Sequence, residues 1–73
     1  SGEGDIVEVR VLNKRVIGKA IGDIHLPEDS LIVMIRRGDK SHIAHPDTRL
    51  LDGDFVTIIG KLGAVQEAAN MVK

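Results

Sequence analysis

The chain contains no cysteine, no tryptophan and no tyrosine, and its single aromatic residue is Phe55. The lack of cysteine excludes disulfides, thiolate catalysis and cysteine-ligated metals, and it favours a cytoplasmic protein. Because 42% of the residues are hydrophobic but only 1% are aromatic, the core has to be aliphatic. A chain of 73 residues buries only about 60% of its unfolded surface, so we expect a partner surface.

Neither sign of charge is in clear surplus, because the chain has 10 basic and 11 acidic residues and a net charge of −1. Proteins that bind nucleic acid polymers usually carry a basic face, and the lysines here are scattered along the chain. No apolar run approaches the roughly 20 residues of a membrane span. We therefore expect neither nucleic acid binding nor membrane insertion. The opening SGEGD predicts a linker or a cloning scar over residues 1–5, which leaves a domain at 6–73.

The hydrophobic pattern predicts an α+β domain with a mainly antiparallel sheet. Period-two alternation indicates strands, and apolar residues at helical spacing indicate helices. Gly18 and Gly22 each weaken the first helix by about 1 kcal/mol, and Pro27 closes it. The predicted order is strand 6–12, helix 16–24, strands 31–35, 41–44 and 54–60, and a helix from 61 onward.

Residues 31–35, LIVMI, are apolar on both faces and indicate a central strand. Strand alternation predicts one face with Leu31, Val33 and Ile35, and another with Ile32 and Met34. We expect a second copy of the chain to cover part of this strand, which makes the domain a homodimer.

In the other elements, Asp52-Gly53 predicts a turn before a strand whose faces carry Phe55 with Ile59, and Val56 with Ile58. The last helix should bury a stripe of apolar residues at helical spacing. The stripe consists of Leu62, Val65, Ala69 and Val72.

The sequence offers no catalytic or cofactor motif. Ser30 and Ser41 lie in no nucleophile-elbow pattern, and residues 18–22 match neither a P-loop nor a dinucleotide fingerprint. The carboxylates at the ends of elements, Asp23, Asp52 and Asp54, are of the kind that forms turns and caps. We therefore expect no enzyme and no cofactor.

The three histidines do not predict a metal site. His42 and His45 are three residues apart, so on an extended strand they would point to opposite faces. His25 lies on a different segment, and no cysteine can complete a zinc site.

Arg36 and Arg37 follow the apolar strand directly. One of them should point back toward the core or toward a dimer seam, where a guanidinium meets a carboxylate or a phosphate. Alternatively, both are surface residues paired with nearby aspartates. The candidate aspartates for such pairing are Asp39, Asp47 and Asp54.

The segments VIGKAIGDIHLPEDSLIVMIRRGD and HPDTRLLDGDFVTIIG, with the closing helix, resemble the TrkA-C domain, also called RCK-C. The resemblance covers about residues 6–72 through the order and spacing of many positions. It implies a dimeric cytoplasmic domain that regulates potassium channels or other cation transporters. It also implies cyclic di-AMP at the dimer seam, with contacts from Ile35, Arg37, His45 and Pro46 of both chains, and we add the neighbouring Arg36 to this candidate set.

The resemblance implies further partners as well, namely a channel or transporter subunit, or an upstream domain of the same chain. The domain would then be cytoplasmic and, through a transporter partner, membrane-associated. Two other interpretations stay open. One is a dimerisation module without a ligand, and the other is a DNA-binding dimer with swapped hairpins.

Overall fold

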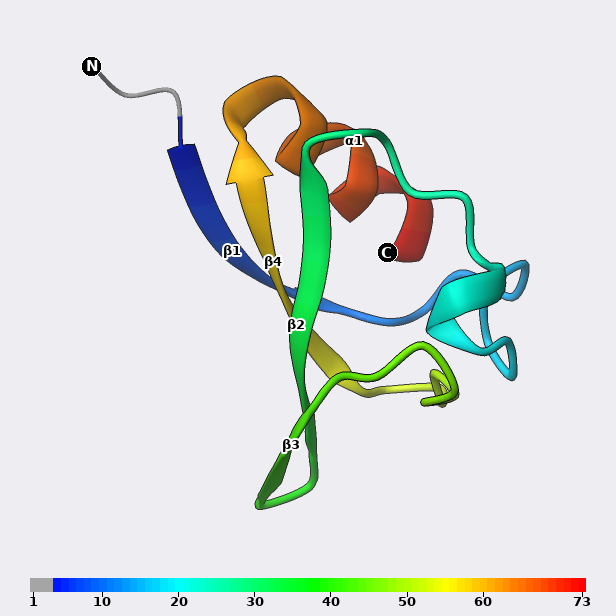
Figure 1. Cartoon of the computed structure of the whole chain (residues 1–73). Helices are drawn as coiled ribbons and strands as arrows, with labels where there is room; N and C mark the ends of the chain where they lie inside the picture. Colours follow the sequence, from blue (N-terminus) through cyan, green and yellow to red (C-terminus); the bar gives the residue numbers. More distant parts are fainter. Residues whose placement is uncertain (1–3) are drawn as a thin grey trace.

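The computed structural model describes residues 4–73, which form an antiparallel four-stranded sheet with one α-helix packed on one face (Figure 1). The elements are β1 (Gly4–Arg10), the 3-10 helix η1 (Ile21–Asp23), β2 (Ser30–Arg37), β3 (Lys40–Ile43), β4 (Phe55–Lys61) and α1 (Leu62–Val72). The strand order is β1-β4-β2-β3, so the predicted α+β class with an antiparallel sheet is confirmed. Of the predicted linker, residues 1–3 lie outside the described residues, and Gly4 and Asp5 belong to β1.

The core lies between α1 and the sheet. It is aliphatic, as predicted, and it includes Val11, Ile32, Ile35, Leu50, Val56, Ile58, Val65, Ala68 and Val72. Of the predicted stripe of α1, Val65 and Val72 are buried and Ala69 is partly buried, while Ala68, which was not predicted, is buried as well. Leu62 is 46% exposed because it is the first helical residue, where the chain turns out of β4. No helix within residues 4–73 is long and apolar enough to cross a membrane.

The central position of β2 is confirmed, but the predicted assignment of its faces is wrong. The register against β4 shifts between Ile32 and Met34, which marks a bulge. A bulge sets two residues against one and reverses the alternation beyond it. Ile32 and Ile35 are therefore both buried, at 3% and 1% exposure, whereas Leu31 is 57% exposed.

In β4, the regular pairing with β1 has no such shift, and the predicted faces are confirmed. Val56 and Ile58 are fully buried, while Phe55 and Ile59 lie half-buried on the other face.

The helix predicted over 16–24 is wrong, because this segment consists of turns followed by the short η1. Gly18 adopts a φ of +88°, which a right-handed helix does not allow. Its N–H donates to the carbonyl of Leu50 at 2.7 Å, and the Lys19 carbonyl accepts from the Leu50 N–H at 3.0 Å. Hydrogen bonds to a distant segment thus replace those of the expected helix.

The hairpin of β2 and β3 projects away from α1 (Figure 1). Its turn is Gly38-Asp39, with Gly38 at a φ of +60°. The register sets His42 opposite Ile35. The hairpin therefore carries three of the candidate site residues, Ile35, Arg36 and Arg37, and the other two, His45 and Pro46, follow shortly after β3.

Gly60 provides a direct test of how β4 packs against the loop before β2. Its φ is +151°, and an added Cβ would overlap the main-chain oxygen of Asp29. Because neither group is a flexible side chain, we expect Gly60→Ala to lower the free energy of unfolding by about 1–3 kcal/mol. Urea denaturation would measure this loss.

The matched control is Gly63→Ala in α1, where an added Cβ has no neighbouring atom within 4 Å. Alanine favours a helix over glycine by up to about 1 kcal/mol, so this variant should be neutral or more stable. Equal stability of the Gly60 and Gly63 variants would contradict the close approach at Gly60.

Candidate functional site

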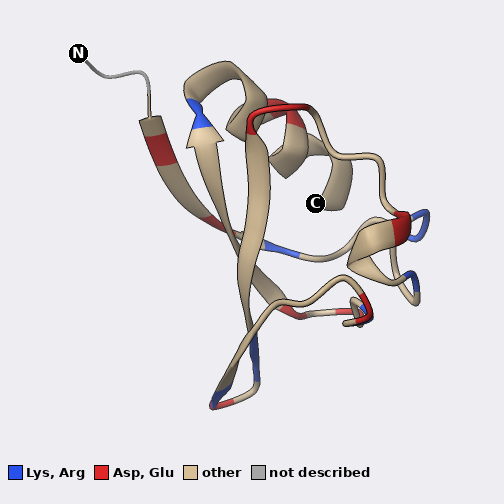
Figure 2. Cartoon of the chain, viewed as in Figure 1, with Lys and Arg blue, Asp and Glu red and all other residues tan. Residues whose placement is uncertain are grey.

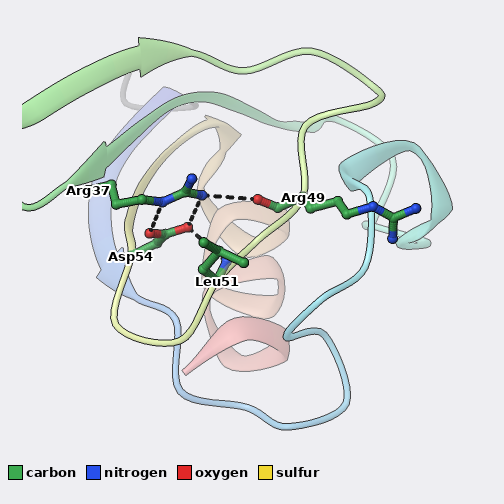
Figure 3. A network of polar contacts seen from close by, with 4 residues as sticks. All are labelled: Arg37, Arg49, Leu51 and Asp54. Carbon is green, nitrogen blue, oxygen red and sulfur yellow. Dashed lines mark hydrogen bonds and ion pairs between the residues drawn. The ribbon is translucent and has the colours of Figure 1, made fainter.

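Arg37 and Asp54 form a two-pronged ion pair at the end of β2 (Figure 3). Nε of Arg37 donates to Oδ1 of Asp54, and Nη2 donates to Oδ2, both at 2.8 Å. Nη2 also donates to the carbonyl of Arg49 at 3.1 Å, and Oδ2 of Asp54 accepts the Leu51 N–H at 2.8 Å. The Asp54 side chain is 1% exposed and that of Arg37 is 43% exposed. The guanidinium therefore covers a buried carboxylate and keeps one side open to solvent.

The geometry of Arg37 combines features of both alternatives that the sequence left open. It points back toward the core side and pairs with Asp54, one of the three aspartates considered. Two parallel N–H···O bonds to an ionised carboxylate are among the stronger polar contacts in proteins. Asp54 is therefore more than the turn residue that its place after Gly53 predicts.

The electrostatics of the pair follow from its surroundings. Burial by itself would raise the pKa of the Asp54 carboxyl, because it disfavours the charged form. The hydrogen bonds from Arg37 and Leu51, together with the positive charge of Arg37, outweigh burial, and the pKa of Asp54 is lowered. The hydrogen bond to Asp54 raises the pKa of Arg37. Both groups are charged at neutral pH.

A hollow of about 550 Å³ lies beside this ion pair, on the hairpin. Among the predicted site residues, Ile35, Arg37 and His45 line it. Ile35 is 1% exposed and so contributes the floor, whereas His45 is exposed at the rim. The hollow therefore offers an apolar base, a guanidinium and an imidazole.

Pro46 lines a neighbouring hollow of about 450 Å³, and His45 stands at both. The Pro46 carbonyl accepts the N–H of Gly22 at 2.8 Å, so this loop is fastened to η1. His45 is held by a turn in which its N–H donates to Oγ1 of Thr48 and its carbonyl accepts the Thr48 N–H, both at 3.0 Å. Four of the five predicted residues are thus neighbours.

Arg36, the fifth, is not brought together with the other four. Neighbouring residues of a strand face opposite sides, and Arg36 lies on the outer face of the sheet. There its Nη2 donates to Oε1 of Glu8 at 3.0 Å, and its guanidinium carbon stacks 4.3 Å from the centre of the Phe55 ring. This exposed pair explains Arg36 without any ligand.

Ser41, His42 and Thr48 also line the hollow, and the sequence interpretation missed them. A hairpin with Gly38-Asp39 as its turn sets residues 35 and 42 opposite each other, so counting from the turn could have found His42. The expectation that His42 and His45 point to opposite faces is wrong, because β3 ends at Ile43 and strand alternation no longer applies. Within residues 4–73, no group of three or more histidines and carboxylates is placed to hold a metal ion.

The charges of the chain are mixed in sign along the fold (Figure 2). At the end of the hairpin, Lys40 lies opposite Arg37 beside Asp39, and further basic residues lie in the loops next to η1.

The fold and this site define a class, the small α+β domains in which a hairpin extends beyond a helix-backed antiparallel sheet. The chain belongs to the TrkA-C domain family, whose model matches residues 6–73. The predicted resemblance is therefore confirmed.

Two similar curated proteins are both described as a Trk system potassium uptake protein TrkA homolog. One, from Archaeoglobus fulgidus, is 36% identical over 68 residues, which cover 93% of this chain and 16% of that protein. The other, from Methanothermobacter thermautotrophicus, is 31% identical over 69 residues, which cover 94% of this chain and 32% of that protein. The chain thus spans less than a third of the length of each of these relatives.

A solved structure described as "Structure of RCK domain with cda" superposes with a TM-score of 0.86 at 25% identity. The superposition covers 93% of this chain and 97% of that one. The likeness therefore extends over nearly the entire fold of both chains.

Proposed function

We propose that this chain is a ligand-sensing regulatory domain that controls potassium or other cation transport, and that it binds cyclic di-AMP as a homodimer. Membership in the TrkA-C family and relatives described as potassium uptake proteins support the regulatory part, and they favour regulation over catalysis. The structural neighbour described with cda supports a small-molecule ligand. The observation that carries the proposal is the hollow in which Ile35, Arg37 and His45 meet.

A symmetric dinucleotide suits a two-fold seam, because each half of the ligand meets the same residues of one chain. Nε and Nη2 of Arg37 are engaged by Asp54, so the ligand would meet Nη1 and the open face of the guanidinium. Such a group donates to phosphate or stacks on a purine. His45 offers a second stacking face, and Ile35 and Pro46 offer apolar contact.

The homodimer would cover apolar surface that a single chain leaves open. Leu31 is 57% exposed, Ile43 is 61% exposed, and Met34 is 36% exposed. A stable interface buries about 800 Å² per partner. That is roughly a sixth of the 4750 Å² surface of this chain, so dimerisation would change the stability of so small a domain markedly.

We place the domain in the cytoplasm, next to a channel or transporter subunit or joined to an upstream domain of its own chain. The names of the curated relatives support this location beside a transport system. The chain matches only a small share of each of those relatives, which supports a further domain in the host protein.

One observation favours a second candidate, a dimerisation module without a ligand. The guanidinium of Arg37 already has a carboxylate and a carbonyl partner within the chain, so no ligand is needed to explain its position. In this alternative, the signal would arise elsewhere in the host protein.

Calorimetric titration with cyclic di-AMP, with sedimentation equilibrium alongside, separates the two candidates. We expect binding at or below about 100 µM, which corresponds to about −5.5 kcal/mol. We also expect a dimer of the 7.9 kDa chain at micromolar concentration. Because its side chain is exposed, His45→Ala should keep the fold and weaken binding about tenfold, a loss of about 1.4 kcal/mol.

The two arginines provide a test variant and its matched control. Arg37→Lys keeps the charge but removes the planar fork and should weaken binding, whereas Arg36→Lys on the opposite face should leave it unchanged. A dimer that does not bind cyclic di-AMP would support the dimerisation module instead. A chain that stays monomeric and does not bind cyclic di-AMP would contradict both candidates.

A further inference from the structure

The turn His45-Pro46-Asp47-Thr48 follows β3 and carries two of the predicted site residues. The Thr48 N–H donates to the His45 carbonyl at 3.0 Å, which is the closing bond of a β-turn. Proline is favoured at the second position of such a turn, because its ring fixes φ at about −65°. The local sequence therefore favours this turn before any ligand binds.

The side chain of Thr48 adds a bond that a β-turn does not need. Its Oγ1 accepts the His45 N–H at 3.0 Å, so the main chain of His45 is bonded at both its N–H and its carbonyl. Without Oγ1, the His45 N–H would lose the partner that it has within residues 4–73. The hydroxyl of Thr48 therefore ties down the residue that carries the imidazole.

The turn is also fastened to η1. The Gly22 N–H donates to the Pro46 carbonyl, and the Ile21 N–H donates to the Thr48 carbonyl, both at 2.8 Å. A Cβ at Gly22 would lie 3.2 Å from the Cβ of Pro46, so the two segments approach closely. η1 thus holds the main chain at Pro46 and Thr48, and Oγ1 of Thr48 extends this hold to His45.

We propose that Thr48 is a positioning residue of the ligand site, and that it acts by fixing His45. This role rests on the function proposed above. A binding site needs its contact groups held within about 0.5 Å of the productive geometry. Because His45 is exposed, packing does little to fix it, and the bond to Oγ1 supplies the constraint.

The three groups that line the hollow are thus held in three different ways. Burial holds Ile35, the two-pronged pair with Asp54 holds Arg37, and the hydroxyl of Thr48 holds His45. Groups that are ordered before the ligand arrives reduce the entropy that binding has to offset. Loosening His45 alone should therefore weaken binding while the core stays intact.

Thr48→Val and Thr48→Ser form a matched pair. Valine keeps the branched shape without the hydroxyl, and serine keeps the hydroxyl without the methyl group. In calorimetric titrations with cyclic di-AMP, we expect Thr48→Val to weaken binding about tenfold and Thr48→Ser to stay within about twofold of the unsubstituted chain. Urea denaturation would identify conditions in which both variants are folded, so that the affinities of folded chains are compared.

Amide hydrogen exchange of the ligand-free chains separates positioning from direct contact, because Thr48 itself lines the hollow. The N–H groups of Ile21 and Gly22 have their acceptors in the turn, so they should exchange about tenfold faster in Thr48→Val. The Leu50 N–H, which donates to the Lys19 carbonyl outside the turn, is the internal control and should exchange at an unchanged rate.

Weaker binding of Thr48→Val with unchanged exchange at Ile21 and Gly22 would make Thr48 a direct ligand contact and would overturn the positioning role. Equal affinities of the valine and serine variants, or a valine variant that does not fold, would overturn it as well. An unsubstituted chain that does not bind cyclic di-AMP would contradict the proposed function itself, and with it this inference.

Discussion

Replacing Arg37 by alanine is expected to lower the free energy of unfolding by about 3 kcal/mol. The variant leaves Asp54, whose side chain is 1% exposed, without its two strongest hydrogen bonds and without a counter-charge. An uncompensated buried carboxylate is costly, whereas an intact pair is nearly neutral relative to apolar residues. Urea denaturation followed by circular dichroism would measure the loss.

Arg36→Ala is the matched control, because its pair with Glu8 is 41% and 46% exposed. Solvent-exposed pairs contribute at most about 1 kcal/mol, so this variant should be only slightly destabilised. The double variant Arg37→Met with Asp54→Leu should recover much of the stability lost in Arg37→Ala, since no charge stays buried. Similar losses for the two single alanine variants would contradict the assigned roles of the two arginines.

The same pair predicts how stability depends on pH. The pKa of Asp54 is lower in the folded chain than in the unfolded chain, where it is about 3.9. The contribution of the pair is therefore fully present above about pH 3.9 and is lost as the pH falls through the lower folded pKa. Asp54→Asn should flatten the loss of stability with acid in this range.

The destabilisation expected for Arg37→Ala also matters for ligand binding. A binding defect of this variant would not locate the site, because the fold itself is weakened.

Replacing Ile35 by alanine is expected to cost about 2–5 kcal/mol of unfolding free energy. Ile35 is 1% exposed and lies in the core between the sheet and α1. The cost consists of the lost burial and of the cavity that the surrounding core cannot fill. Thermal or urea denaturation of the dilute chain would measure it.

Met34→Ala, one position away on the same strand, is the control. Met34 is 36% exposed on the outer face, so in the dilute chain the change should stay within about 0.5 kcal/mol. In the homodimer, by contrast, we expect Met34→Ala to weaken the association of the two chains. A loss below half a kilocalorie per mole for Ile35→Ala would mean that Ile35 does not face the core.

Much of the candidate site could be anticipated, for reasons that particular residues make clear. Gly38-Asp39 is a strong local turn signal, so the hairpin and its end were predictable, and Ile35 and Arg37 with them. That His45 lies close to Arg37 was predicted from the family resemblance, because no periodicity relates residues on different segments. The choice of Asp54 over Asp39 and Asp47 was open, because all three are equally acidic in sequence and only one is buried beside the guanidinium.

Local chemistry in the chain settled the aliphatic core, the strands of β1 and β4, the amphipathic α1 and the antiparallel α+β class, because each rests on a periodicity that burial of one face imposes. Folding alone decided the bulge near Val33, which reverses the faces of β2, and the turns at Gly18, where hydrogen bonds to Leu50 replace a helix. Folding also gave the two arginines different partners, Glu8 for Arg36 and Asp54 for Arg37. These features depend on bonds between segments far apart in the chain, and such bonds form only where the packed sheet brings the segments together.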